Sequence, residues 1–113
     1  MKKWKSEPEY QAYLKKKRIP ALFNEDENLR VLKNDAQIQP GIPDLSVTLH
    51  GKAAYLEVKI SKDAEHQPNQ DYYVNNENDN GGFGRFIYPE NEKEVLRQLK
   101  DYMSKWSLIF KFY

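Results

Sequence analysis

Hydrophobic and polar residues alternate most regularly between residues 44 and 60, in two runs that are separated by a glycine-containing turn. A period of two is typical of a β-strand that buries one face and leaves the other face polar. Two such runs around residues 50–52 therefore predict a β-hairpin. Its polar face carries Asp44, Glu57 and Lys59. Its apolar face carries Leu45, Val47, Leu49, Leu56, Val58 and Ile60.

The chain before the hairpin predicts a helix, a short strand and a second short helix. Ser6 is a suitable N-cap, and acidic residues follow it in the first turn. Pro20 is expected to end this helix. Residues 19–23 form a short apolar run that predicts a strand, and residues 29–38 predict a short helix. The apolar positions of the first helix are Tyr10, Tyr13 and Leu14.

The chain after the hairpin predicts a helix, a strand and a longer helix. A proline in the first turn favours a helix that begins near residues 67–70. Residues 75–82 are rich in Asn, Asp and Gly and predict a loop, whereas residues 83–88 predict a strand. Residues 90–106 predict an amphipathic helix, and the apolar tail at residues 108–113 predicts either a last strand or a docking segment. The stripe of the long helix consists of Val95, Leu96, Leu99, Tyr102, Met103 and Trp106.

This order of elements predicts an α/β (α+β) fold with a mixed central β-sheet flanked by helices. The length of the chain fits a single domain over residues 1–113. The absence of cysteine excludes disulfides and thiolate metal sites. No run approaches the roughly 18 apolar residues of a membrane span, and the basic N-terminus lacks the apolar segment of a signal peptide. These features predict a soluble intracellular protein without a membrane partner.

Positive charge is concentrated near the N-terminus. The formal net charge is +1, but residues 1–18 contain seven Lys and Arg residues against two Glu residues. A basic surface of this kind can bind a phosphate backbone even on a protein of low net charge. The alternative interpretation is a helix face that is simply exposed to solvent. The candidates for nucleic-acid contact in this segment are Lys15, Lys16, Lys17 and Arg18.

The polar face of the hairpin is a candidate metal site. A turn at His50 and Gly51 places Asp44 opposite Glu57, whereas a turn one residue later places Asp44 opposite Lys59. Either register keeps all three charged side chains on one face, and directly opposed residues have Cβ atoms about 4.5–5.5 Å apart. Facing carboxylates repel each other unless a cation lies between them, and hard oxygen ligands favour Mg²⁺ or Mn²⁺. The alternative is an ordinary solvent-facing side of an amphipathic sheet.

Residues 41–45, GIPDL, and residues 55–59, YLEVK, resemble the G-x-P-D-L … E-x-K signature of the PD-(D/E)xK nucleases. Within that class the chain looks most like the VRR-NUC branch, which is common in phages and is related in fold to Holliday junction resolvases. Residues 7–11, 24–30 and 67–70 are also similar to segments of that branch. The resemblance therefore extends over nearly the whole chain.

This resemblance implies a restriction-endonuclease-like core and a metal-dependent endonuclease that hydrolyses DNA, duplex or branched, as a cytoplasmic homodimer. The cytoplasm would be that of the host cell if a phage encodes the chain. Asp44, Glu57 and the backbone carbonyl of Val58 would bind Mg²⁺ or Mn²⁺, and Lys59 would assist the attacking water. A helix acid would complete the site. The further residues that the resemblance implies are Glu7 or Glu9 as that acid, Gln70 beside the lysine, and Asn24 and Arg30 in contact with DNA.

Two departures from the branch leave the subfamily and the substrate open. The VRR tripeptide is absent, and NNENDN at residues 75–80 replaces a more apolar helix end. A second hypothesis is therefore a catalytically inactive nucleic-acid-binding module or a protein-interaction module, such as a phage inhibitor or an accessory subunit. His50 and His66 have no partner at metal-ligand spacing, and they are predicted to be a turn residue and a surface residue.

Overall fold

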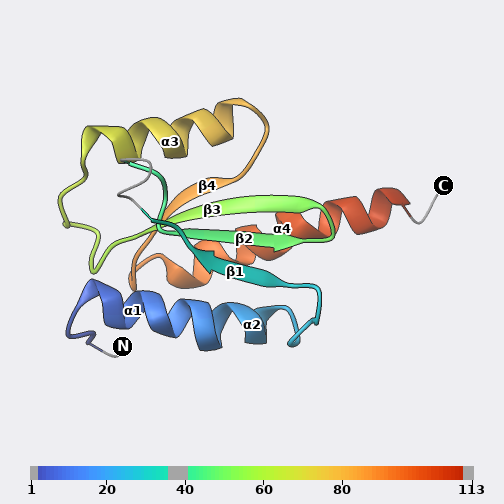
Figure 1. The fold of residues 1–113 in the computed structure, drawn as a ribbon, viewed down its shortest axis with the longest axis horizontal. Coiled ribbons are helices and arrows are strands. Elements are labelled where there is room, and N and C mark those ends of the chain that lie inside the picture. The colour runs from blue at the N-terminus through green and yellow to red at the C-terminus, as the bar shows by residue number, and fades with distance from the viewer. Residues whose placement is uncertain (1–2, 36–40, 111–113) are drawn as a thin grey trace.

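Four strands form one mixed β-sheet across the middle of the protein (Figure 1). The computed structural model describes residues 3–35 and 41–110, the last six of them by their backbone alone. The strands are β1 (Arg30–Lys33), β2 (Leu45–Leu49), β3 (Lys52–Val58) and β4 (Gly84–Ile87). They lie in the order β1-β2-β3-β4; β2 is antiparallel to both of its neighbours, and β4 is parallel to β3. This arrangement confirms the predicted mixed sheet of an α+β domain.

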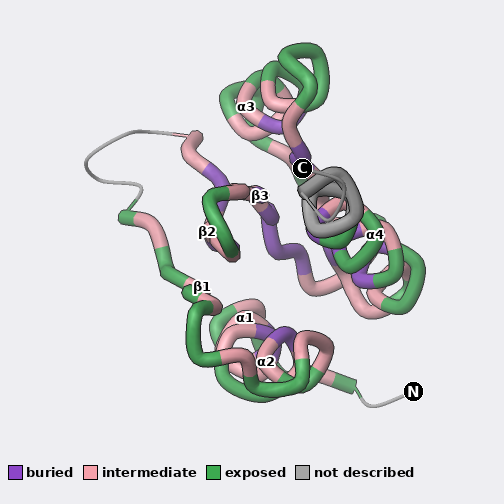
Figure 2. The backbone as a smooth tube through the Cα atoms, turned by 90° about the vertical axis from the view of Figure 1, so that its right-hand side faces the viewer, coloured by how far each residue is buried: buried purple, intermediate pink, exposed green. Residues whose placement is uncertain are grey.

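Helices pack on both sides of this sheet. They are α1 (Glu7–Tyr13), which continues through the π-helical turn η1 (Leu14–Arg18) into α2 (Ile19–Leu22), then α3 (Pro68–Asp79) and α4 (Glu92–Phe110). In Figures 1 and 2, α3 lies on the opposite side of the strands from α1 and α2. None of the helices in the described part of the chain is long and apolar enough to cross a membrane.

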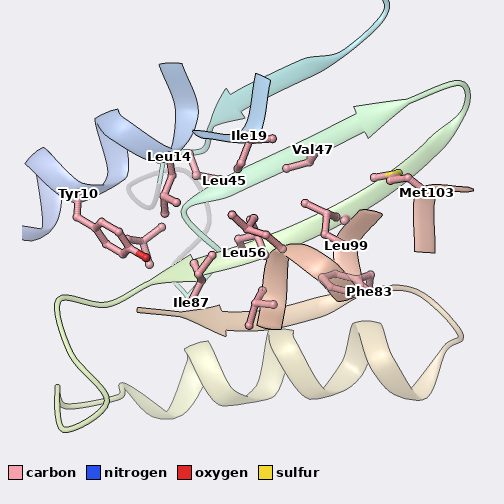
Figure 3. Packing of buried hydrophobic residues seen from close by; sticks show 14 residues of the cluster. Tyr10, Leu14, Ile19, Leu45, Val47, Leu56, Phe83, Ile87, Leu99 and Met103 are labelled. Atoms are coloured by element: carbon pink, nitrogen blue, oxygen red, sulfur yellow. The ribbon is translucent and has the colours of Figure 1, made fainter. Parts of the chain in front are cut away.

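The apolar core lies between the sheet, α4 and the segment formed by α1, η1 and α2 (Figure 3). The predicted apolar face of the hairpin contributes to it, since Leu45, Val47, Leu56 and Val58 are all buried. The buried cluster consists of Tyr10, Leu14, Ile19, Leu45, Val47, Ala54, Leu56, Val58, Phe83, Ile87, Val95, Leu96, Leu99 and Met103. Because this cluster occupies one face of β2 and β3, the polar residues of these strands lie on the other face.

The hairpin of β2 and β3 adopts the first of the two registers considered above. Leu45 pairs with Leu56, and the two turn residues at positions 50 and 51 have φ values of 49° and 83°. Positive φ at both positions is what a tight two-residue hairpin turn requires. One position beyond the last pair, this register places Asp44 opposite Glu57.

The first helix does not end at Pro20, and the predicted strand at residues 19–23 is wrong. In a regular α-helix the proline ring would clash with the carbonyl four residues earlier. The wider turn η1 avoids this clash, because the N–H of Ile19 donates to the carbonyl of Leu14, five residues earlier. The same turn keeps Ile19 and Leu14 on one buried face and leaves Lys16 exposed.

The predicted helix at residues 29–38 is also wrong, because Arg30–Lys33 form strand β1. This strand pairs along its whole length with β2, from Arg30 opposite Thr48 to Lys33 opposite Leu45. Four residues have no strong intrinsic preference, so the hydrogen bonds that β2 offers decide their conformation. Residues 36–38 of that prediction lie outside the described residues.

The predicted loop at residues 75–82 is wrong for its first five residues, because α3 continues through Asp79. Asparagine is a poor helix former, so this end of α3 depends on tertiary contacts. Asn78 supplies one of them: its Nδ2 donates to the carbonyl of Gly84 at 2.8 Å, and its Oδ1 accepts from the Gly84 N–H at 3.0 Å. A Cβ at position 84 would lie 2.7 Å from the Val74 carbonyl oxygen, so the close approach of α3 to β4 requires glycine there.

Asn78→Ala is expected to lower the free energy of unfolding by about 1–2 kcal/mol, because it leaves the N–H of buried Gly84 without its partner and removes one of the two donors to the Gly84 carbonyl, the other being Nη1 of Arg85. Urea denaturation followed by circular dichroism would measure this loss. Asn75→Ala is the matched control, since Asn75 is exposed on the same helix. The control should be neutral or slightly stabilising. Equal stability of the two variants would contradict this role of Asn78.

The long C-terminal helix is confirmed, with α4 beginning at Glu92. Its predicted stripe faces the core, with Leu99 and Met103 buried and Tyr102 partly buried. The side chain of Trp106 lies outside what the structure describes. The backbone of residues 108–110 continues α4, so this part of the tail is not a strand. Residues 111–113 lie outside the described residues.

Candidate functional site

Asp44 and Glu57 face each other at the end of the hairpin that is remote from its turn. Asp44 directly precedes β2, and Glu57 lies one residue before the end of β3. The Oδ2 atom of Asp44 accepts from the N–H of Val58 at 2.9 Å, which holds this carboxyl group against β3. The Asp44 carboxyl group also raises the pKa of Glu57, through its charge and as a hydrogen-bond acceptor for the protonated Glu57 side chain. Because an ionised carboxylate can only accept, Glu57 is the member of the pair that carries the proton.

Burial determines the protonation of this pair. Glu57 is only 2% exposed, whereas a residue on the polar face of a sheet is expected to be exposed to solvent. Burial, the hydrogen bond with Asp44 and the negative charge of Asp44 together raise the pKa of Glu57 to about 9, against the opposing charge of Lys59. The site without a cation therefore carries a proton at neutral pH. A cation between the two oxygens would compete with this proton.

Lys59 is buried beside the carboxyl pair, with 5% of its surface exposed. Its Nζ donates to the carbonyl of Glu65 at 3.0 Å and to Oε1 of Gln70 at 2.8 Å. Gln70 is itself fixed, because its Oε1 also accepts from the N–H of Gln67 at 3.0 Å in the capping box of α3. A buried ammonium group needs such partners. The start of α3 and the loop before it thus fix the position of the lysine.

Of the two candidate acids at the start of α1, Glu7 is the one directed to this site. Its negative charge contributes to the raised pKa of Glu57. Glu9 instead accepts from the N–H of Lys5 at 2.8 Å, and its own N–H donates to Oγ of Ser6 at 3.2 Å. Glu9 therefore stabilises the helix start, whereas the fold brings Glu7 to the carboxyl pair.

The donors that could hold a metal ion here are all oxygen atoms. They are the carboxyl groups of Asp44 and Glu57 and the carbonyl of Val58. The Val58 N–H points to Asp44, and the N–H and C=O of one strand residue lie on the same edge, so its carbonyl faces the same side. Within residues 3–35 and 41–110, no group of three or more His, Cys, Asp or Glu side chains is placed to hold a metal. A small hard cation fits a site with two carboxylates, because water and phosphate oxygens complete its coordination.

Of the basic residues predicted to contact nucleic acid on η1, the lysines and the arginine have different surroundings. Lys16 and Lys17 are exposed on η1, with Lys15 partly buried beside them. Arg18 instead pairs with Glu92, with Nε and Oε2 3.2 Å apart, and so joins η1 to α4. The lysines thus form the open part of the basic segment, and the arginine has a structural partner.

Asn24 and Arg30 are not brought to the carboxyl pair. Arg30 lies opposite Thr48, near the turn of the hairpin and at the other end of β2 from Asp44. Its guanidinium donates to the carbonyls of residues 27 and 29. Asn24 has a φ of 55° in the turn that follows α2. Both residues therefore serve the conformation of the connection to β1.

His66, predicted to be a surface residue, lies beside the site with 32% of its side chain exposed. Its ring stacks on Phe86 at 3.9 Å between centroids, with an interplanar angle of 9°, and Nδ1 lies 3.1 Å from Oδ1 of Asp71. Phe86 pairs with Glu57 across β3 and β4, so the stacked rings lie beside the carboxyl site. His50 lies in the hairpin turn, as predicted.

The sequence does not reveal two features of this site. An alternating strand predicts a solvent-exposed polar face, whereas α3 and the loop before it bury Glu57 and Lys59. The contact of Lys59 with the Glu65 carbonyl involves the backbone, and so no side-chain pattern announces it. The sequence does contain one signal for this burial. Gln70, a residue of the capping box of α3, follows the E-x-K segment, and so it marks the start of a helix that can cover these residues. Comparison with protein-family models, curated proteins and solved structures found no match.

Proposed function

We propose that the chain is a metal-dependent DNA endonuclease of the PD-(D/E)xK class, similar to the VRR-NUC branch and built on a restriction-endonuclease-like core. The observation that carries this proposal is that Asp44 lies opposite the buried Glu57, whose face of the sheet also carries the buried Lys59. A sheet stabilised by packing alone gains nothing from burying an acid and a lysine on its second face. An acid with a strongly raised pKa, such as Glu57, is typical of functional sites.

Each residue of the site has a role in hydrolysis of a phosphodiester. Asp44, Glu57 and the Val58 carbonyl would hold the cation, and Glu57 would release its proton on binding it. A bound Mg²⁺ or Mn²⁺ ion would supply charge stabilisation for the scissile phosphate and activation of the attacking water. Lys59, held by Gln70, orients this water and stabilises negative charge on the phosphate. Glu7 accepts a hydrogen bond from the water that approaches phosphorus.

The exposed lysines of η1 support DNA as the substrate. Helix α1 starts with Glu7, whose charge acts on Glu57, and the lysine run begins two residues after the end of this helix. At a rise of about 1.5 Å per residue, Lys16 lies roughly 14 Å further along the helix axis. A duplex or branched DNA with a phosphate at the site can therefore place further phosphates along η1. Since so small a domain contacts little DNA, we propose that it acts as a homodimer with two sites.

Replacing Lys15, Lys16 and Lys17 together by Gln is expected to weaken DNA binding and to flatten its dependence on salt. The slope of log K against log salt should decrease by about 0.9 for each lysine that contacts a duplex phosphate. Fluorescence anisotropy at several salt concentrations would measure it. A control with the same loss of charge replaces the exposed Lys33, Lys93 and Lys100. An equal change in the slope of log K against log salt for both triple variants would show that DNA does not bind along the lysines of η1.

The experiment that tests the proposed function is cleavage of labelled linear duplex, flap, splayed-arm, four-way-junction and single-stranded DNA. Each substrate is incubated with Mn²⁺, Mg²⁺ or EDTA. Cutting that requires a divalent cation and disappears in the Asp44→Ala variant supports the nuclease, and the preferred DNA identifies its substrate class. DNA or protein binding that is the same in EDTA, without cutting of any substrate, would instead support a binding or accessory module.

A further inference from the structure

Gln11 is a polar residue on the face of α1 that otherwise packs into the core. Glu7, Tyr10, Gln11 and Leu14 follow the i, i+3, i+4, i+7 spacing of a single helix face. Tyr10 and Leu14 of this face are completely buried. Packing alone would favour an apolar residue at position 11. The two polar positions of the face, 7 and 11, are one turn apart.

The side-chain nitrogen of Gln11 is buried and lacks a hydrogen-bond partner. Among the residues that the structure describes, it is the only buried side-chain nitrogen or oxygen in this condition. An unpaired buried donor is destabilising, and in native proteins such a group is commonly satisfied by a bound water, ion or ligand. The amide of Gln11 therefore indicates an acceptor that the protein itself does not provide.

The position of Gln11 on α1 places it one turn from Glu7 on the same helix face. Side chains on an α-helix lean toward its N-terminus, and residues four apart have Cβ atoms about 5–6 Å apart. Gln11 thus leans toward the turn that carries Glu7. Glu7 in turn interacts electrostatically with Glu57. A donor at position 11 and an acceptor at position 7 border the same side of the site.

From these placements we infer that Gln11 is a positioning residue. Its Nε2–H donates to a water molecule, and this water in turn donates to the carboxylate of Glu7. This inference rests on the proposed nuclease function. A water held by one donor and one acceptor has a fixed orientation of its lone pairs. Gln11 thereby aims the oxygen at phosphorus. In the attack this oxygen joins phosphorus while the bond between phosphorus and the leaving oxygen of the strand breaks. Glu7 takes the proton that the water loses, and the leaving oxygen takes a proton from solvent and departs as a hydroxyl group.

The test replaces Gln11 by Met, which keeps its length, and by Ala, which keeps the helix. Both variants should cut saturating DNA 10- to 100-fold more slowly than wild type in single-turnover reactions with Mn²⁺, as residues that orient a ligand typically do. DNA affinity should stay within about twofold. Gln11→Met should be at least as stable as wild type in EDTA, because it removes the unpaired donor. Gln98→Met on α4 is the control, since Gln98 is half-buried but bonded to Arg85, and it should cut at the wild-type rate.

A double variant separates this role from a structural one. If Gln11 and Glu7 act on the same water, Gln11→Met should slow the Glu7→Gln variant much less than it slows wild type. Wild-type cutting rates in both Gln11 variants would overturn this inference but not the nuclease proposal. A loss of DNA affinity or of stability that accounts for the slower cutting would do the same. A wild-type protein that neither cuts DNA nor gains thermal stability from Mn²⁺ would overturn the nuclease proposal first and this inference with it.

Discussion

Asp44→Asn is expected to reduce metal-dependent DNA cleavage by at least about 10³-fold, which corresponds to a loss of roughly 4 kcal/mol of transition-state stabilisation. Asparagine keeps the size of the side chain, and its Oδ1 can still accept from the N–H of Val58. The fold is therefore retained, while a neutral amide is a much weaker ligand for a hard cation than a carboxylate. Rates under single-turnover conditions with saturating Mn²⁺ would measure this loss.

The control for this variant is Asp79→Asn, which makes the same change of charge at the exposed end of α3. It should cut DNA at the wild-type rate. Asp44→Asn should also bind DNA with nearly wild-type affinity in EDTA, since the basic segment is unchanged. Residual cutting by Asp44→Asn above one tenth of the wild-type rate would show that Asp44 does not hold the cation.

Glu57→Gln is expected to have opposite effects on stability and on activity. In wild type without metal, Glu57 has a pKa raised to about 9 by burial and by Asp44, against an ordinary value of 4.5. Between these two values the folded protein binds more protons than the unfolded chain, so stability falls as the pH rises. Glutamine carries no such dependence. We therefore expect Glu57→Gln to be more stable than wild type by about 1–3 kcal/mol at pH 8 in EDTA, and less so at pH 5.

Urea denaturation at pH 5, 6.5 and 8 in EDTA would measure this difference, with Glu27→Gln as an exposed control of the same chemistry. Addition of Mn²⁺ should then raise the melting temperature of wild type and leave that of Glu57→Gln unchanged, because binding to the folded state alone stabilises it. Cleavage should be lost in parallel. A wild type whose stability in EDTA does not decline between pH 5 and 8 would contradict the raised pKa of Glu57.

The candidate site could be predicted from the sequence because a strand has a strict period of two. Asp44, Glu57 and Lys59 lie on one face in both of the registers that a two-residue turn within residues 50–52 allows, so their proximity did not depend on the choice between these two turns. The choice between Glu7 and Glu9 could not be made in this way. It depends on the angle at which α1 meets the sheet, and this angle is set by packing between residues distant in sequence.

The errors in the predicted fold have two physical causes. At Pro20 the cause is local, because the π-helical turn directly before the proline lets the helix continue past it.

At β1 and in α3 the cause is contact between separate elements. The residues of β1 have no strong preference of their own, and pairing with β2 extends them. The asparagines of α3 are poor helix formers, but Asn78 makes two hydrogen bonds to Gly84 of β4. These partners belong to other elements, so the local pattern carries no information about them.

The parallel pairing of β3 with β4 determines when the site can assemble during folding. The β2–β3 hairpin forms from neighbouring residues, whereas β4 can pair only after the whole segment that carries α3 has crossed the sheet. Non-local closures of this kind are slower than hairpin formation. The partners of Lys59 lie in that crossing segment. A folding chain therefore brings its two acids together in water first, and it encloses them, with the lysine, only at the late closure of the crossover.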